Sequence, residues 1–151
     1  MTNEREVTAI HEAGHCLVAE RLGYRVKKAW ISTSNDENGE FRLEFKADFK
    51  RCFRSFLKSE ESVMMIISGN EAQKHFFPDS EILPSDDRDL RKLSNVLDVD
   101  VDKSKQALQK ILSNERNLEA IKMIARILDT DGKIAGQEIR AIIARIDFSP
   151  L

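Results

Sequence analysis

The chain has 151 residues, of which 41% are apolar and 33% are charged, and this length and composition predict one compact, folded domain. Its 24 Lys and Arg residues nearly balance its 26 Asp and Glu residues. The resulting net charge of −2 argues against a nucleic-acid partner, which would need a broad basic surface.

Cysteine usage and hydropathy predict the compartment. The two cysteines, Cys16 and Cys52, form neither a CxxC pair nor a metal-ligand pair, which is typical of a reducing cytoplasm. No apolar signal segment follows Met1, and no later run reaches the roughly 18 apolar residues of a membrane span. A GxxxxGK[ST] phosphate loop is also absent from the sequence. We therefore expect a cytoplasmic protein without a membrane span, and any ATPase would be another chain acting in trans.

The first fifty residues predict a helix and a β-hairpin. Asn3 and Glu6 have capping-box spacing, and an apolar stripe with helical period then continues to Leu22. The run 26–33 is strand-like, and the run 41–46 alternates apolar and charged residues after a turn. These two runs predict a hairpin with one solvated face.

The rest of the chain predicts helices. Ser59, and the run Ser85, Asp86 and Asp87, stand where helices would begin. Asp98, Asp100 and Asp102 fit a helix cap better than a metal site. Apolar residues with helical period predict helices around residues 49–58, 63–69, 90–97, 107–112, 118–128 and 139–146. The predicted fold is therefore mainly α (α+β), as a single domain 1–151 with the hairpin in 1–97 and C-terminal helices in 98–151.

The first predicted helix contains the pentapeptide His11-Glu12-Ala13-Gly14-His15. At 3.6 residues per turn, His11 and His15 project from the same face, so both imidazoles can bind one Zn²⁺ ion. Glu12 is rotated by about 100° from His11 and can act as a general base toward a water activated by the metal. Small residues within the motif would let another backbone or a substrate approach this helix closely.

A catalytic zinc ion needs a third protein ligand. His75 is the remaining histidine, but its position near a helix end favours an ordinary surface or capping role. The other candidates are Asp86, Asp87 and Asp89, and at most one of them would bind the metal. The spacing alone leaves the choice among these residues open.

The sequence around the motif resembles the FtsH-type zinc metallopeptidases, the proteolytic domain of membrane-anchored AAA+ proteases. His11 to Ala19 is similar to the HEAGHALVA helix of that family, and 26–32 to the strand that follows it. Residues 67–73 resemble the LAGRAAE helix, and 85–97 the SNDLxxAT segment. The closing IAxxLL and DGEEI helices are matched in patches between residues 124 and 139.

The resemblance implies a zincin-like fold with the hairpin next to the HExxH helix, and it selects Asp89 as the third zinc ligand. Three positions depart from the family pattern. Arg88 replaces an Asn before the ligand, Leu93 is bulkier than the family's Ala, and Gln73 replaces the glutamate that the resemblance places near the metal. Losing that carboxylate would change the hydrogen bonds around the ligands, and with them metal affinity.

A second stretch, near the C-terminus, partly matches a calcium-binding EF-hand loop but lacks its first ligand. Asp129, Asp131, Gly132 and Glu138 match oxygen-ligand and glycine positions of an EF-hand loop, but Ile127 stands at the first ligand position. A turn between two helices is the simpler interpretation of this stretch.

The sequence as a whole predicts a zinc metalloendopeptidase acting on a protein or peptide substrate, with His11, His15 and Asp89 as ligands and Glu12 as general base. An edge of the hairpin, either 26–33 or 40–46, could hold an extended peptide by strand addition. The resemblance also implies a homo-oligomer, a hexamer in the family. The alternatives are a non-catalytic binding or adaptor module with a structural or vestigial metal site, and, well behind, a calcium-responsive helical protein.

Overall fold

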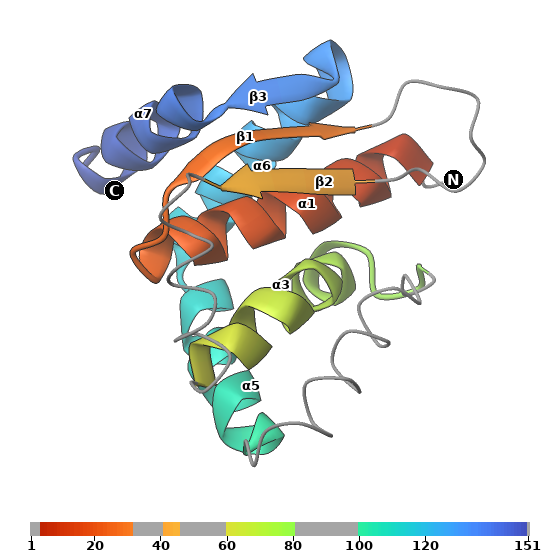
Figure 1. Cartoon of the computed structure of the whole chain (residues 1–151), viewed down its shortest axis with the longest axis vertical. Helices are drawn as coiled ribbons and strands as arrows, with labels where there is room; N and C mark the ends of the chain where they lie inside the picture. Colours follow the sequence, from red (N-terminus) through yellow and green to blue (C-terminus); the bar gives the residue numbers. More distant parts are fainter. Residues whose placement is uncertain (1–3, 32–40, 46–59, 81–99, 151) are drawn as a thin grey trace.

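A computed structural model describes residues 4–31, 41–45, 60–80 and 100–150 (Figure 1). The described chain is mainly helical with a small antiparallel sheet, as the sequence predicts. None of its helices is both long and apolar enough to cross a membrane. The elements are α1 (Glu4–Arg21), β1 (Val26–Ile31), β2 (Phe41–Phe45), α3 (Glu60–Phe76), α5 (Val101–Leu112), α6 (Glu115–Asp131), β3 (Lys133–Ala135) and α7 (Gly136–Asp147). The helices predicted around 49–58 and 90–97 lie outside the described residues.

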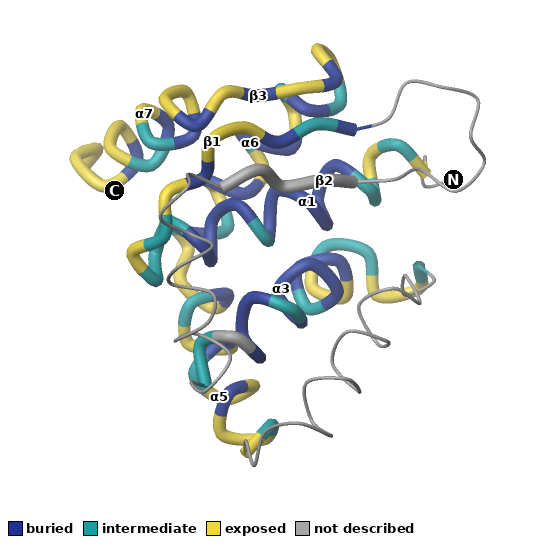
Figure 2. The backbone as a smooth tube through the Cα atoms, in the orientation of Figure 1, coloured by how far each residue is buried: buried dark blue, intermediate teal, exposed yellow. Residues whose placement is uncertain are grey.

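Helix α1 is the centre of the described fold. It packs against α3 on one side, and against α6 and the sheet on the other (Figure 1). It is therefore buried along most of its length (Figure 2): every residue from Ala9 to Ala19 is buried except His15, which is half-buried. The helix ends before Gly23, whose φ of 90° is left-handed and costs glycine little.

The described residues form a sheet of three strands in the order β2-β1-β3, one strand more than the predicted hairpin. Strands β1 and β2 pair antiparallel as expected, and β3 adds to the other edge of β1 with Ala29 opposite Ile134. The stretch after α6 was predicted to be only a turn. Gly132 caps α6 with a φ of 78°, and its carbonyl accepts a hydrogen bond from the Ile31 N–H at 2.8 Å, which aligns β3 with β1.

Strand β1 has the solvated face that the sequence predicts. Val26, Ala29 and Ile31 are buried, whereas Lys27 and Lys28 are exposed. The break in alternation coincides with an irregularity in the pairing with β2 between Val26 and Lys28. Because β1 is the middle strand, the prediction that 26–33 could offer a free edge to a peptide is wrong, and β2 is the edge strand of the hairpin.

The C-terminal helices confirm the capping assignment of the acidic stretch. The Asp100 side chain accepts a hydrogen bond from the Lys103 N–H and caps α5. Asp129 and Asp131 lie in the last turn of α6 rather than in a metal-binding loop, and Asp129 forms an ion pair with Arg5 at 3.2 Å. The structure therefore gives no support to the EF-hand interpretation.

Candidate metal centre

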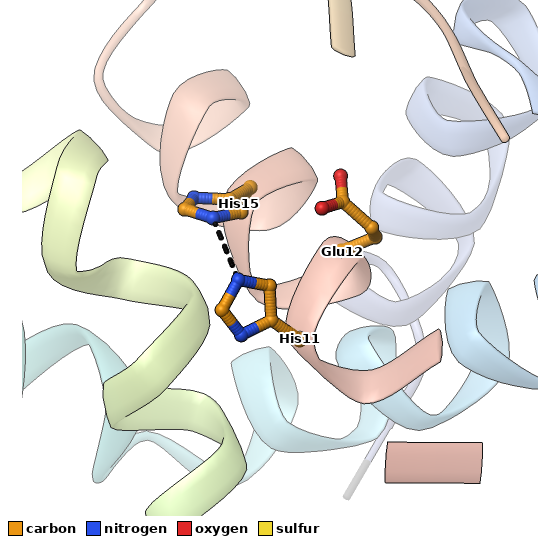
Figure 3. Close-up of side chains that lie close together, drawn as sticks. All are labelled: His11, Glu12 and His15. Atoms are coloured by element: carbon orange, nitrogen blue, oxygen red, sulfur yellow. Dashed lines mark hydrogen bonds between the residues drawn. The ribbon is translucent and has the colours of Figure 1, made fainter. Parts of the chain in front are cut away.

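The two motif histidines lie on one face of α1 and face each other. Nε2 of His11 lies 3.2 Å from Nε2 of His15 (Figure 3), and their rings meet edge to face with centroids 4.9 Å apart. The four-residue spacing within a regular helix produces this arrangement, as the sequence predicts. His11 is buried, with 1% of its surface exposed, and His15 is half-buried.

Helix α3 determines which nitrogen of His15 carries the proton. Nδ1 of His15 lies 2.9 Å from the Met65 carbonyl oxygen and 2.9 Å from Oγ of Ser68. A carbonyl oxygen can only accept, and the Ser68 hydroxyl itself donates to the same carbonyl at 2.7 Å. Nδ1 of His15 is therefore the donor, and in the neutral ring the lone pair is on Nε2.

The same helix holds His11 through an amide. Nδ1 of His11 lies 3.2 Å from Oε1 of Gln73, which is 1% exposed. An amide oxygen only accepts hydrogen bonds, so Nδ1 donates and Nε2 again carries the lone pair. The sequence analysis expected residue 73 near the metal site, and the structure brings it into contact with a motif histidine.

The two Nε2 atoms lie within hydrogen-bond distance of each other (dashed in Figure 3), so at 3.2 Å they are held either by an Nε2–H of one ring donating to the other or by a cation between two lone pairs. Two nitrogens bound at about 2.0–2.1 Å to one tetrahedral zinc ion are about 3.3 Å apart. The observed spacing and the orientation of both rings fit a shared metal ion. Histidine binds metals as a neutral imidazole, commonly with its Nδ1–H donating a hydrogen bond to an acceptor and its Nε2 free to bind the ion.

Glu12 lies beside this pair rather than between the two rings (Figure 3). One ligand atom from each of His11, Glu12 and His15 lies within 4.8 Å of the others, the one such group within the described ranges. The Glu12 side chain is buried, at 4% exposure. This placement is suited to a carboxylate that acts on a molecule held at the metal rather than on the metal itself.

Cys16 follows the motif but does not join the metal group. Complete burial raises the pKa of its thiol well above the ordinary value, and the nearby carboxylates of Glu12 and Glu20 raise it further. The thiol is therefore protonated at neutral pH, and a protonated thiol is neither a nucleophile nor a metal ligand.

Two glycines allow α1 and α3 to approach each other at the site. A Cβ atom at Gly14 would lie 2.6 Å from Cβ of Ala72 and 3.0 Å from the Ser68 carbonyl oxygen. The expectation that small motif residues admit a second backbone is confirmed. A Cβ atom at Gly69 would lie 2.5 Å from Nε2 of both histidines, so the absence of a side chain there keeps the space next to both nitrogens open. Sequence reasoning did not assign this role to Gly69, although an isolated glycine in an apolar helix signals close packing.

The three aspartates predicted as candidates for the third ligand, Asp86, Asp87 and Asp89, lie outside the described residues. His75 is exposed near the end of α3, where its ring packs against Phe76, and this agrees with the surface role predicted for it.

The chain matches no protein-family model and no curated protein.

Proposed function

We propose that this chain is a zinc-dependent metalloendopeptidase with a zincin-like site. The observation that carries the proposal is the pair of Nε2 atoms 3.2 Å apart, both in rings whose Nδ1 donates to an acceptor on α3. The neighbouring buried carboxylate of Glu12 adds the base that peptide hydrolysis by water requires.

His11, His15 and Asp89 would hold the zinc ion. A bound zinc ion polarises a carbonyl oxygen and lowers the pKa of a water molecule toward about 7. Asp89 enters this set through the family resemblance, since the SNDLxxAT register places it at the ligand position. Two neutral imidazoles and one carboxylate form a set of three ligands that is typical of catalytic zinc sites. A fourth coordination position would then remain for water.

Glu12 would move the protons. Its carboxylate takes a proton from the attacking water and then gives a proton to the leaving amine. Water is the nucleophile, so no acyl-enzyme forms, which is consistent with the raised pKa of the nearby Cys16 thiol. The burial of Glu12 limits competing bulk water around this carboxylate.

The substrate would be an unfolded protein or a peptide. Among the described strands, β2 lies at an edge of the sheet and pairs with β1 on one side, so an extended segment would add along its other side. The resemblance further implies assembly into a homo-oligomer and delivery of substrate by an ATPase in trans. These partners belong to the same proposal as the activity.

A non-catalytic binding or adaptor module is the second candidate. His11 is 1% exposed and Glu12 is 4% exposed, and a metal ion held among such buried side chains would add directly to folding stability. Gln73 also gives His11 a neutral partner where the family has a carboxylate. In this function the metal would stabilise the α1–α3 contact without hydrolysis.

The Glu12→Gln variant separates the two functions. Both proteins are loaded with zinc, their zinc content is measured, and cleavage of unfolded casein is followed. The peptidase proposal predicts that the variant keeps its zinc and loses cleavage by at least about a hundredfold. Wild-type protein that holds zinc and cleaves no faster than Glu12→Gln would favour the adaptor.

A further inference from the structure

A chain of hydrogen bonds leads from His11 to the end of α3. Nδ1 of His11 donates to Oε1 of Gln73, and Nε2 of Gln73 donates to Oγ of Ser80 at 2.8 Å. The Ser80 hydroxyl donates to the carbonyl oxygen of Phe77 at 2.7 Å. Three hydrogen bonds, through the side chains of Gln73 and Ser80, therefore connect the His11 imidazole to a backbone carbonyl outside the motif.

The direction of this chain is set at its far end. The Phe77 carbonyl can only accept, so the Ser80 hydroxyl donates to it and offers a lone pair to Gln73. The Gln73 amide must then direct its NH₂ group toward Ser80 and its oxygen toward His11. The two ends of an amide are nearly equal in shape, and the Ser80 lone pair favours this orientation over the flipped one, in which the amide oxygen would face Ser80.

A tight turn holds Ser80 in place. The backbone N–H of Ser80 donates to the Phe77 carbonyl oxygen at 3.0 Å, which closes a four-residue turn at the end of α3. Pro78 occupies the second position of this turn, which its fixed φ favours. The Phe77 N–H also donates to the Gln73 carbonyl oxygen at 2.7 Å, so the turn is continuous with the helix that carries Gln73.

We infer that Ser80 is a positioning residue for the metal site: through Gln73 it holds His11 with its proton on Nδ1 and its lone pair on Nε2. This inference rests on the proposed metal site but not on hydrolysis. His15 needs no such device, because a carbonyl oxygen already faces its Nδ1. The Gln73 amide oxygen therefore accepts the hydrogen bond from His11 Nδ1, as a glutamate carboxylate would, because Ser80 fixes the orientation of the amide.

The inference is tested first in the metal-free protein. Long-range ¹H–¹⁵N correlation spectra, recorded above the ordinary imidazole pKa of about 6.5, report which nitrogen of each neutral ring is protonated. In wild type, His11 is expected to carry its proton on Nδ1, and in Ser80→Ala part of the population should shift to Nε2–H. A wild-type His11 protonated on Nε2 would overturn the inference without any mutation.

Zinc affinity is the second measurement, made by competition with a chelator. Ser80→Ala should weaken binding by about tenfold to a hundredfold, as expected when a hydrogen bond that orients a ligand is lost. Ser80→Thr keeps the hydroxyl and should restore most of the affinity. Ser149→Ala is a matched control, because that exposed hydroxyl also donates to a backbone carbonyl, the carbonyl of Arg145, away from the site.

A double-mutant cycle distinguishes positioning from a general structural role. In Gln73→Glu, a carboxylate faces His11 and can only accept, so the direction of the chain no longer depends on Ser80. Ser80→Ala should then cost less than about twofold in zinc affinity in the Gln73→Glu background. An equal loss in both backgrounds would show that Ser80 only supports the turn. Failure of hydrolysis with these affinities intact would count against the proposed activity alone.

Discussion

The two helices that pack against α1 make different kinds of contact with it. Toward α6, polar contacts lie at the two ends of α1, where Arg5 binds the Asp129 carbonyl and Arg21 binds Asn117, and buried apolar residues line α6 between them. Toward α3, the polar contacts come from the middle of α1 and are buried at His11 and half-buried at His15, with both imidazoles in direct contact with the neighbouring helix.

The two kinds of contact contribute differently to stability and to the proposed site. Apolar contacts of the α6 kind contribute stability in proportion to buried area, and other apolar residues of similar size can replace them. Buried polar contacts of the α3 kind are costly unless every partner is present, and they add little net stability. The polar part of the α3 contact is therefore best explained by the proposed metal site, whereas the apolar residues of α3 and α6 contribute to stability.

The largest expected effect is on the α6 side. Leu128 is fully buried in α6, and Leu128→Ala should lower the free energy of unfolding by about 3 kcal/mol through lost burial and a cavity. Urea denaturation measures the change. Zinc affinity of the folded variant should stay within about threefold of wild type, since the site lies on the opposite helix contact. A large loss of zinc affinity in the folded protein would break the separation of the two contacts.

The next largest effect is expected on the α3 side, where a substitution should lower zinc affinity and leave the unfolding free energy nearly unchanged. Gly69→Ala places a methyl group 2.5 Å from both Nε2 atoms and should weaken zinc binding by at least about a hundredfold, or about 2.7 kcal/mol. Its unfolding free energy should change by less than about 1 kcal/mol, because alanine favours helix formation and the imidazoles can move. Chelator competition and urea denaturation give the two values.

Gly14→Ala is the matched control for that variant. Its methyl group would press on Ala72 and on the Ser68 carbonyl rather than on the imidazole nitrogens. We expect its main effect on unfolding, about 1–3 kcal/mol, because backbone must shift. Equal zinc loss in both glycine variants at equal stability would contradict the assignment of Gly69 to the site.

The smallest effect is at the end of α1. Arg21 forms two hydrogen bonds with Asp147 of α7, at 2.8 and 2.6 Å, and these bonds hold the pKa of the Asp147 carboxyl below its ordinary value. Because both groups are partly exposed, Asp147→Asn should cost only about 0.5–1 kcal/mol at neutral pH.

The pH dependence of that cost follows from the sign of the shift. A lowered carboxyl pKa in the folded state means that the stabilisation is complete above the unfolded pKa of about 3.9. It is lost as pH falls below that value and through the folded pKa. The difference between wild type and Asp147→Asn should therefore be constant near neutrality and shrink in acid. A difference that persists in strong acid would exclude the ion pair as its cause.

Local patterns were enough to predict most of the described fold. The helical stripe before Gly23, the alternating hairpin and the Asp100 cap all depend on neighbours in sequence, and all three are confirmed. Strand β3 was missed because three residues carry almost no periodic signal. Its stabilising partner, β1, lies about a hundred residues earlier in the chain, so no local pattern reveals the pairing.

The site was predictable only in part, because a local sequence pattern does not reveal contacts between residues that are distant in the chain. The HExxH spacing is local, so the convergence of His11 and His15 followed from helix geometry alone. Ser68, Gly69 and Ser80 act across a helix contact, and their residue types are common outside metal sites. Gln73 was noticed only because it departs from the family pattern, and its role became clear from its contact with His11.

The central claim is that His11 and His15 hold a zinc ion together with Asp89. Elemental analysis of purified wild type, His15→Ala, Asp89→Ala and the exposed-histidine control His75→Ala tests it most directly. We expect about one zinc ion per chain in wild type and in His75→Ala, and its loss in the other two variants. A wild-type protein that remains metal-free after zinc loading, or a His15→Ala variant that keeps its zinc, would contradict the claim.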